Sequence, residues 1–179
     1  MKIYYNFRKL KFLKVEIMMK EKITFFNTIM IAIIKEMRLE RNIHQAVLAD
    51  ICGKTISAWS KIEKGKSPMS LELFCKICNT LRVQPSLVMI TLERYADVLA
   101  QNGYIILTEI QNEQPDTLLE QLDKYYSSEE FKNRQLNFTH YNWNISILNT
   151  PYYDINGNLI LNNAFRYIIQ NAHTQYIEK

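Results

Sequence analysis

The sequence predicts a mainly α-helical N-terminal part followed by a small α+β C-terminal part. Between residues 28 and 92, apolar residues recur with helical spacing in short stretches separated by Gly and by cap-forming residues. After residue 103, stretches rich in Tyr, Ile and Trp alternate with helical stretches, which is typical of mixed α and β structure. Only four Gly and four Pro occur in 179 residues, which argues against a turn-dense all-β architecture.

The overall composition is that of an ordinary folded chain. Apolar residues make up 47% and charged residues 22%, which excludes a wholly disordered protein. We expect three segments: a basic extension over residues 1–22, a DNA-binding domain over 23–92, and a dimerisation or regulatory domain over 93–179. The extension has two interpretations: either translation begins at Met18 or Met19, or a basic arm folds on DNA.

The charge is unevenly distributed along the chain. Residues 1–27 carry seven Lys and Arg against two Asp and Glu, and residues 28–92 carry nine against five. Residues 93–179 carry six against eleven. A basic N-terminal part and an acidic C-terminal part predict that the N-terminal part binds a polyanion, unless the difference is chance variation of surface charge.

The first strongly apolar stretch, from Ile23 to Ile34, is interpreted as the buried side of a helix running from Thr24 to Arg41. Its twelve residues are too few to span a bilayer. The charged segment KEMRLER follows directly, with no small-residue cleavage site of the kind that ends a signal peptide. We therefore expect no membrane segment and a cytoplasmic protein.

Two short helices joined by a tight turn follow. Leu48, Ala49 and Cys52 share one face of the first, and Gly53 stands where a helix needs a left-handed C-terminal residue. Thr55 is a good N-cap for the second, which runs from Ile56 to Lys64 and is closed by a further Gly. This arrangement is a helix-turn-helix.

At these residues the chain resembles the phage-repressor/Cro (XRE-type) helix-turn-helix family. The resemblance covers about 65 of 179 residues and implies a lambda-repressor-like five-helix domain that binds double-stranded DNA. The positions that carry it are Arg38, Gln45, Leu48, Ala49, Gly53, Thr55, Trp59, Ser60, Ile62, Glu63, Gly65, Pro68, Leu71, Phe74, Ile77, Cys78, Leu81 and Val83.

The resemblance also implies roles for individual residues. The recognition helix would lie in the major groove, and Gln45 at the start of the preceding helix would hold a phosphate. Arg38 and Glu63 would form a structural ion pair that orients the recognition helix. The expected DNA-contacting set is Gln45, Lys54, Thr55, Ile56, Ser57, Ser60, Lys61, Lys64 and Lys66.

Three departures from the family pattern have consequences. Ile56 takes a position where a polar base-reading residue is common, so it packs either on a thymine methyl group or partly into the protein. Trp59 is larger than the usual core residue, and we expect it to be buried. Val47 and Ile51 replace exposed polar residues, which suggests that this helix face contacts protein in the C-terminal region.

The C-terminal half resembles no family. We expect strands at 104–110 and 139–148, a hairpin at 152–161, and helices at 117–126, after Ser128, and at 164–177, with three or four antiparallel strands in all. Its aromatic residues form either a core or a surface for a ligand, a protein partner or a second copy: Tyr125, Tyr126, Tyr141, Trp143, Tyr152, Tyr153, Phe165 and Tyr167.

The sequence offers no set of residues for catalysis or for a cofactor. Cys75 and Cys78 form a lone C-x-x-C without the second pair that a zinc site needs, and we interpret them and Cys52 as small hydrophobic residues. We therefore expect neither an enzyme nor a metalloprotein.

The function that follows is sequence-specific transcriptional regulation, as a repressor, by a homodimer on an inverted-repeat operator. Two alternatives remain. The chain is an antitoxin whose rear half neutralises a toxin, or an inhibitor that uses the fold only to bind another protein. An ordered C-terminal half disfavours the antitoxin, and the cluster of Lys residues beside Gln45 disfavours the inhibitor.

Overall fold

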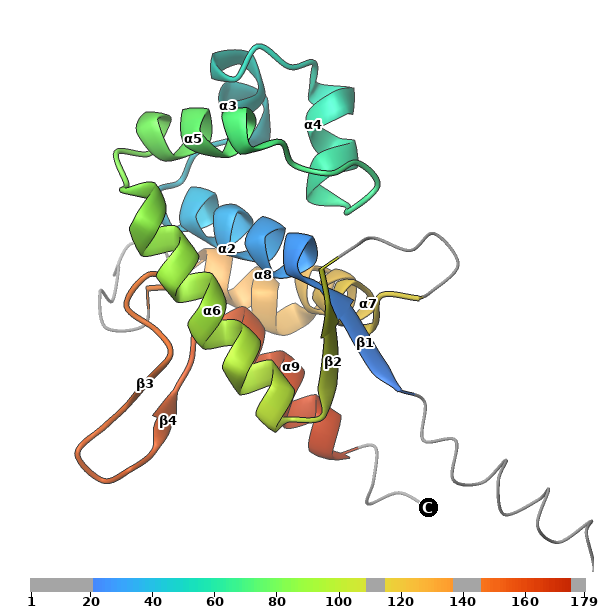
Figure 1. Ribbon diagram of the computed structural model, residues 1–179, viewed down its shortest axis with the longest axis vertical. Coiled ribbons are helices and arrows are strands. Elements are labelled where there is room, and N and C mark those ends of the chain that lie inside the picture. Colours follow the sequence, from blue (N-terminus) through green and yellow to red (C-terminus); the bar gives the residue numbers. More distant parts are fainter. Residues whose placement is uncertain (1–20, 109–114, 137–145, 175–179) are drawn as a thin grey trace, which may run out of the picture.

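The computed structural model describes residues 21–108, 115–136 and 146–174. The described part is mostly helical, with two small two-stranded sheets (Figure 1). The helices are α2 Phe26–Glu40, α3 Gln45–Ile51, α4 Ile56–Glu63, α5 Leu71–Thr80, α6 Pro85–Gln101, α7 Thr117–Tyr126, α8 Glu129–Leu136 and α9 Asn163–Thr174. The strands are β1 Lys22–Phe25, β2 Tyr104–Leu107, β3 Tyr152–Tyr153 and β4 Leu159–Ile160. The predicted alternatives for residues 1–17 lie outside the described residues.

The helix-turn-helix is built as its sequence pattern predicts. The His44 side chain accepts a hydrogen bond from the Ala46 backbone N–H at 3.2 Å, and α3 follows it. The turn to α4 passes through Gly53 at φ +66°, a left-handed conformation that disfavours residues with a Cβ. The Thr55 hydroxyl then accepts from the Ala58 N–H at 3.1 Å and caps α4. Trp59 is fully buried, as expected.

The predicted start of the first helix is wrong, because the residues before Phe26 form a strand. β1 pairs in parallel with β2, with Lys22 opposite Tyr104 and Phe25 opposite Leu107. The local spacing of the apolar run predicts a single helix. Pairing with a strand about 80 residues later, which no local pattern reveals, decides the conformation instead.

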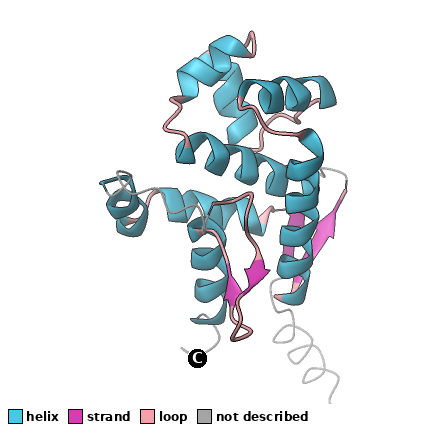
Figure 2. Cartoon of the chain, turned by 90° about the vertical axis from the view of Figure 1, so that its left-hand side faces the viewer, coloured by secondary structure: helices cyan, strands magenta, loops and turns pink. Residues whose placement is uncertain are grey.

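One hydrophobic core joins both halves of the chain. Buried side chains of α2, α4, α5 and α6 belong to the same cluster as Leu118, Tyr125 and Phe165 of α7 and α9. α6 itself runs through the predicted boundary at residue 92. Both views show α3, α4 and α5 at one end of the molecule and α9 with the β3–β4 hairpin at the other (Figures 1 and 2). The division into domains stays a prediction, while the packing across it is continuous.

The C-terminal half follows the predicted helices more closely than the predicted sheet. α7 and the β3–β4 hairpin lie where expected, and Asp154 accepts two backbone N–H groups across the hairpin turn. Among the described residues only β3 and β4 pair antiparallel, and the expected strand at 104–110 instead pairs in parallel with β1 as β2. Residues 137–145 of the expected strand lie outside the described part, and its end at 147–148 forms a turn.

Candidate nucleic-acid interface

α4 is amphipathic, with one buried and one exposed face. Trp59 and Ile62 are buried, while Ile56, Ser57 and Lys61 are exposed. Ile56 keeps 58% of its surface accessible, which favours a contact with DNA over the alternative that it packs partly into the protein. Ser60 lies between the two faces and is partly buried. The exposed face thus offers one ammonium, hydroxyl groups and one apolar side chain, which match the groups displayed in a DNA major groove.

A buried carboxylate fixes the orientation of α4. Glu63 pairs with Arg38 of α2 at 2.9 Å, and the two side chains are only 7% and 8% exposed. Its Oε1 also accepts from the Trp59 indole N–H at 2.8 Å, and its Oε2 accepts from the Gln45 amide at 3.3 Å. Arg38 additionally donates to the Ile43 carbonyl at 2.9 Å. Helices α2, α3 and α4 are therefore tied to one carboxylate, with its hydrogen-bonding capacity well satisfied.

The resemblance implied the Arg38–Glu63 pair, but the sequence alone did not reveal what surrounds it. Its burial makes the pair more consequential than an exposed one, because removing either partner leaves a desolvated charge. The Trp59 N–H explains why a residue larger than the family norm is accommodated: it fills the core and donates to Glu63.

Gln45 stands at the first residue of α3, where the resemblance places a phosphate contact. Its side chain is partly buried. Since an amide nitrogen carries two N–H groups, the bond to Glu63 leaves a second donor for a phosphate oxygen. The bond holds the amide in place before any ligand arrives.

Four exposed lysines surround α4: Lys54, Lys61, Lys64 and Lys66. Lys54, Thr55, Ser57 and Lys61 line a shallow groove of about 500 Å³ between α4 and residues 67–70. The structure thus places the predicted set on α4, at its two ends and, with Gln45, at the start of α3. Such clusters of positive charge attract the phosphate backbone.

The expected contact of α3 with the C-terminal region is wrong for the described residues. Val47 and Ile51 remain 51% and 46% exposed. The pattern signalled an unusual apolar face correctly, but nothing in the described part of the chain covers it.

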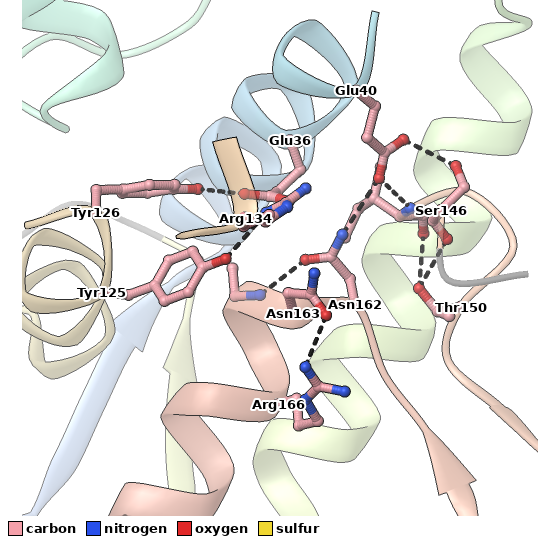
Figure 3. Close-up of polar contacts among 12 residues, drawn as sticks. Glu36, Glu40, Tyr125, Tyr126, Arg134, Ser146, Thr150, Asn162, Asn163 and Arg166 are labelled. Carbon is pink, nitrogen blue, oxygen red and sulfur yellow. Dashed lines mark hydrogen bonds and ion pairs between the residues drawn. The ribbon is translucent and has the colours of Figure 1, made fainter. Parts of the chain in front are cut away.

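A second polar cluster, which the sequence did not reveal, joins α2 to the C-terminal half (Figure 3). Fully buried Glu36 pairs with Arg134 of α8 at 2.7 Å and accepts from the Tyr126 hydroxyl at 3.0 Å. Burial raises the pKa of Tyr126 well above its usual range, with the charge of Glu36 adding to the effect. The phenol therefore stays protonated and remains a donor.

Glu40, one turn further along α2, holds the segment before the hairpin. It accepts from the Ser146 hydroxyl at 2.8 Å, from the Ile147 N–H at 2.7 Å and from the Asn162 amide at 3.2 Å. We call the contacts of Glu36 and Glu40 with the C-terminal half the polar joint. It fixes α8 and residues 146–162 to the same helix that carries Arg38.

The aromatic residues of the C-terminal half divide between core and surface. Tyr125 and Phe165 are fully buried, and Phe165 stacks on Tyr95 with ring centroids 3.9 Å apart. Tyr152 and Tyr153 on the hairpin are exposed. Tyr141 and Trp143 lie outside the described residues.

The described residues hold no group of three or more His, Cys, Asp or Glu side chains arranged to bind a metal. Cys52 and Cys78 are buried, Cys75 is exposed, and burial raises the pKa of Cys78 to about 11. No helix in the described part is long and apolar enough to cross a membrane.

Comparison with known proteins identifies the N-terminal part. Residues 34–88 match the family model described as helix-turn-helix, and no family model matches the remainder. No curated protein and no solved structure matches the chain. The matched segment runs from α2 into α6 and contains every residue of the predicted DNA-contacting set. The match supports a role of this protein in DNA binding and transcriptional regulation.

Proposed function

We propose that this protein is a sequence-specific transcriptional repressor that binds an inverted-repeat operator as a homodimer. The observation that carries the proposal is the exposed face of α4, rigidly oriented by the buried carboxylate of Glu63. A recognition helix must present its side chains in a fixed register to read base edges, and this anchoring supplies the register.

The roles follow from the chemistry of the exposed side chains. Lys61 donates to guanine O6 and N7, whereas Ser57 and Ser60 bond to several bases and discriminate weakly. Ile56 packs on a thymine methyl group, consistent with its exposure. Gln45, Thr55, Lys54, Lys64 and Lys66 position the protein through phosphate contacts, which carry no base information.

A dimer supplies what one recognition helix lacks, because one helix reads only a few base pairs. We assign most of the dimer contact to residues 93–179. The hairpin supports this assignment: Tyr153 is 63% exposed and Ile155, at its tip, is fully exposed. Asp154 holds the tip rigid by accepting from the backbone N–H groups of Asn156 and Asn158, so little ordering is needed on association.

The DNA test uses the full chain and random duplexes, with the bound fraction selected and sequenced. We expect an inverted repeat whose half-site centres lie about 10–10.5 bp apart or a multiple of that distance. Recovery of no enriched sequence would contradict a sequence-specific regulator.

The dimer test also uses the full chain, because a fragment ending at residue 92 would cut α6 and remove β2 from β1. Light scattering should show a dimer for the parent protein and a monomer for the variant Tyr153→Ser/Ile155→Asp. The control is Leu71→Asp, which charges another exposed apolar residue, in the N-terminal part, and should leave the dimer intact. A variant hairpin that still dimerises would contradict the assignment.

A further inference from the structure

A cleft of about 700 Å³ lies between the helix-turn-helix and the C-terminal helices α7 and α8. α2 contributes Lys35 to its wall, the start of α3 contributes Gln45, and α4 contributes Ser60. Tyr126 of α7 and Phe131 of α8 also line the cleft, with ring centroids 5.1 Å apart in an edge-to-face arrangement. The cleft therefore combines hydrogen-bond donors from the predicted DNA-binding elements with an aromatic wall.

Lys35 is the unusual group in this cleft. Its ammonium lies 3.4 Å from the centroid of the Tyr126 ring, and among the described residues it makes no hydrogen bond or ion pair. The side chain is partly buried, and burial lowers its pKa, partly offset by the more distant charge of Glu63. A desolvated ammonium that contacts only an aromatic face gains from a counter-ion at short range.

The nearby carboxylates are already engaged elsewhere. Glu63 accepts from Arg38, Trp59 and Gln45, and Glu36 pairs with Arg134. Asp123 lines the cleft but is exposed and does not reach ion-pair distance of Lys35. Lys64 also lines the cleft. The charges in the cleft that lack a close partner, those of Lys35, Lys64 and Asp123, therefore sum to a small positive excess.

We propose that this cleft is a binding site for a phosphate-class anion, held by the Lys35 ammonium with the Gln45 amide and the Ser60 hydroxyl. The aromatic side, Tyr126 and Phe131, has room for a ring attached to the anion. The phosphate belongs either to a small phosphorylated molecule or to the DNA backbone, because Gln45 and Ser60 also belong to the proposed interface. In the second case the inference rests on the proposed function.

The first arm measures inorganic phosphate by titration calorimetry on the full chain, at constant ionic strength set with chloride. Lys35→Met should weaken phosphate binding at least about tenfold, since one charge-assisted contact is lost. Lys35→Arg should retain most of it. The matched control is Lys22→Met, because Lys22 also lies over a tyrosine ring, 5.5 Å from the Tyr104 centroid, but outside the cleft.

The second arm distinguishes the two sources. The salt dependence of DNA binding is compared between the parent and Lys35→Met. If Lys35 holds a backbone phosphate, the slope of log K against log salt should become shallower by about 0.9. An unchanged slope together with lost phosphate binding assigns the cleft to a free anion. Unchanged slope and unchanged phosphate binding would overturn the proposal.

Failure of DNA binding in the parent would overturn the proposed function and leave the phosphate arm intact. Should Lys35→Met not fold, NMR on the parent protein replaces it. The Lys35 Cε resonance should then move on addition of phosphate, whereas the Lys22 resonance should stay. A stationary Lys35 resonance at saturating phosphate counts against the site.

Discussion

Two clusters around carboxylates lie along α2, and they differ in what they hold together. Glu63 connects α2, α3 and α4, elements that follow one another closely in the chain. Glu36 and Glu40 connect α2 to residues 90 to 122 positions later. The first cluster sets the geometry of the predicted reading helix, and the second sets where the C-terminal half sits relative to it. Orientation of the recognition helix and attachment of the rear half are therefore separable by mutation.

The largest effect is expected at Trp59, which serves the first cluster as both core residue and donor. Trp59→Ala should cost about 3–5 kcal/mol of unfolding free energy, because it leaves a cavity and removes a hydrogen bond to Glu63. Urea denaturation measures the loss. Trp59→Phe separates the two contributions, since it keeps most of the volume and loses only the N–H. A parent-like midpoint for Trp59→Ala would show that the helix packing is wrong.

The two clusters are compared directly by Glu36→Gln and Glu63→Gln. Each variant leaves a desolvated guanidinium without its counter-charge, so each should lose roughly 3 kcal/mol of stability. The two variants should differ in which helix loses protection from amide hydrogen exchange. Glu36→Gln should speed amide hydrogen exchange in α8, whereas Glu63→Gln should speed it in α4. Identical exchange patterns in the two variants would argue that the clusters act as one unit.

A smaller effect is expected on the exposed face of α4. Lys61→Ala should weaken binding to the selected operator by about 1–3 kcal/mol while leaving stability unchanged, because the side chain is exposed and unpaired among the described residues. Fluorescence anisotropy with labelled duplex measures it. Lys124→Ala, which removes another exposed charge, from α7, is the control and should bind like the parent.

The smallest expected effect concerns Asp116, which caps α7 and accepts from Thr28 of α2. Burial raises its pKa, so the folded state holds this proton more tightly than the unfolded state does. The contribution of Asp116 to stability is therefore fully present below its pKa in the unfolded chain. It is lost as the pH rises through its pKa in the folded protein.

Asp116→Asn keeps the acceptor oxygen of the cap and removes the titration. Relative to this variant, the parent should lose stability between the ordinary aspartate pKa, 3.8, and a somewhat higher pH. Urea midpoints measured across that interval for both proteins show the difference. A parent that gains stability relative to Asp116→Asn in this interval would contradict the sign.

The sequence predicted the helix-turn-helix well because each of its signals is local. Gly53, Thr55 and the apolar spacing of α3 and α4 act within a few residues of where they stand. The Glu63 cluster was predictable in part, since the family resemblance implied Arg38 as its partner. The additional donors, Trp59 and Gln45, required knowledge of how three helices meet.

The rest depended on contacts between distant residues. The local spacing at β1 predicts part of a helix, because only pairing with β2 reveals it as a strand. The polar joint left no signal, since Glu36 and Glu40 look like ordinary charges on a helix until the C-terminal half covers them. The same holds for Lys35, whose position beside Tyr126 depends on α7 packing against α2.

The claim that α4 reads the operator is tested most directly by comparing selected sequences. Random duplexes are bound to the parent and to Lys61→Ala, and the enriched fractions are sequenced. We predict that the variant keeps the same inverted repeat but loses its preference at one base pair in each half-site, at symmetry-related positions. An identical motif for both proteins, or a general loss of enrichment with no position singled out, would contradict base reading by this face of α4.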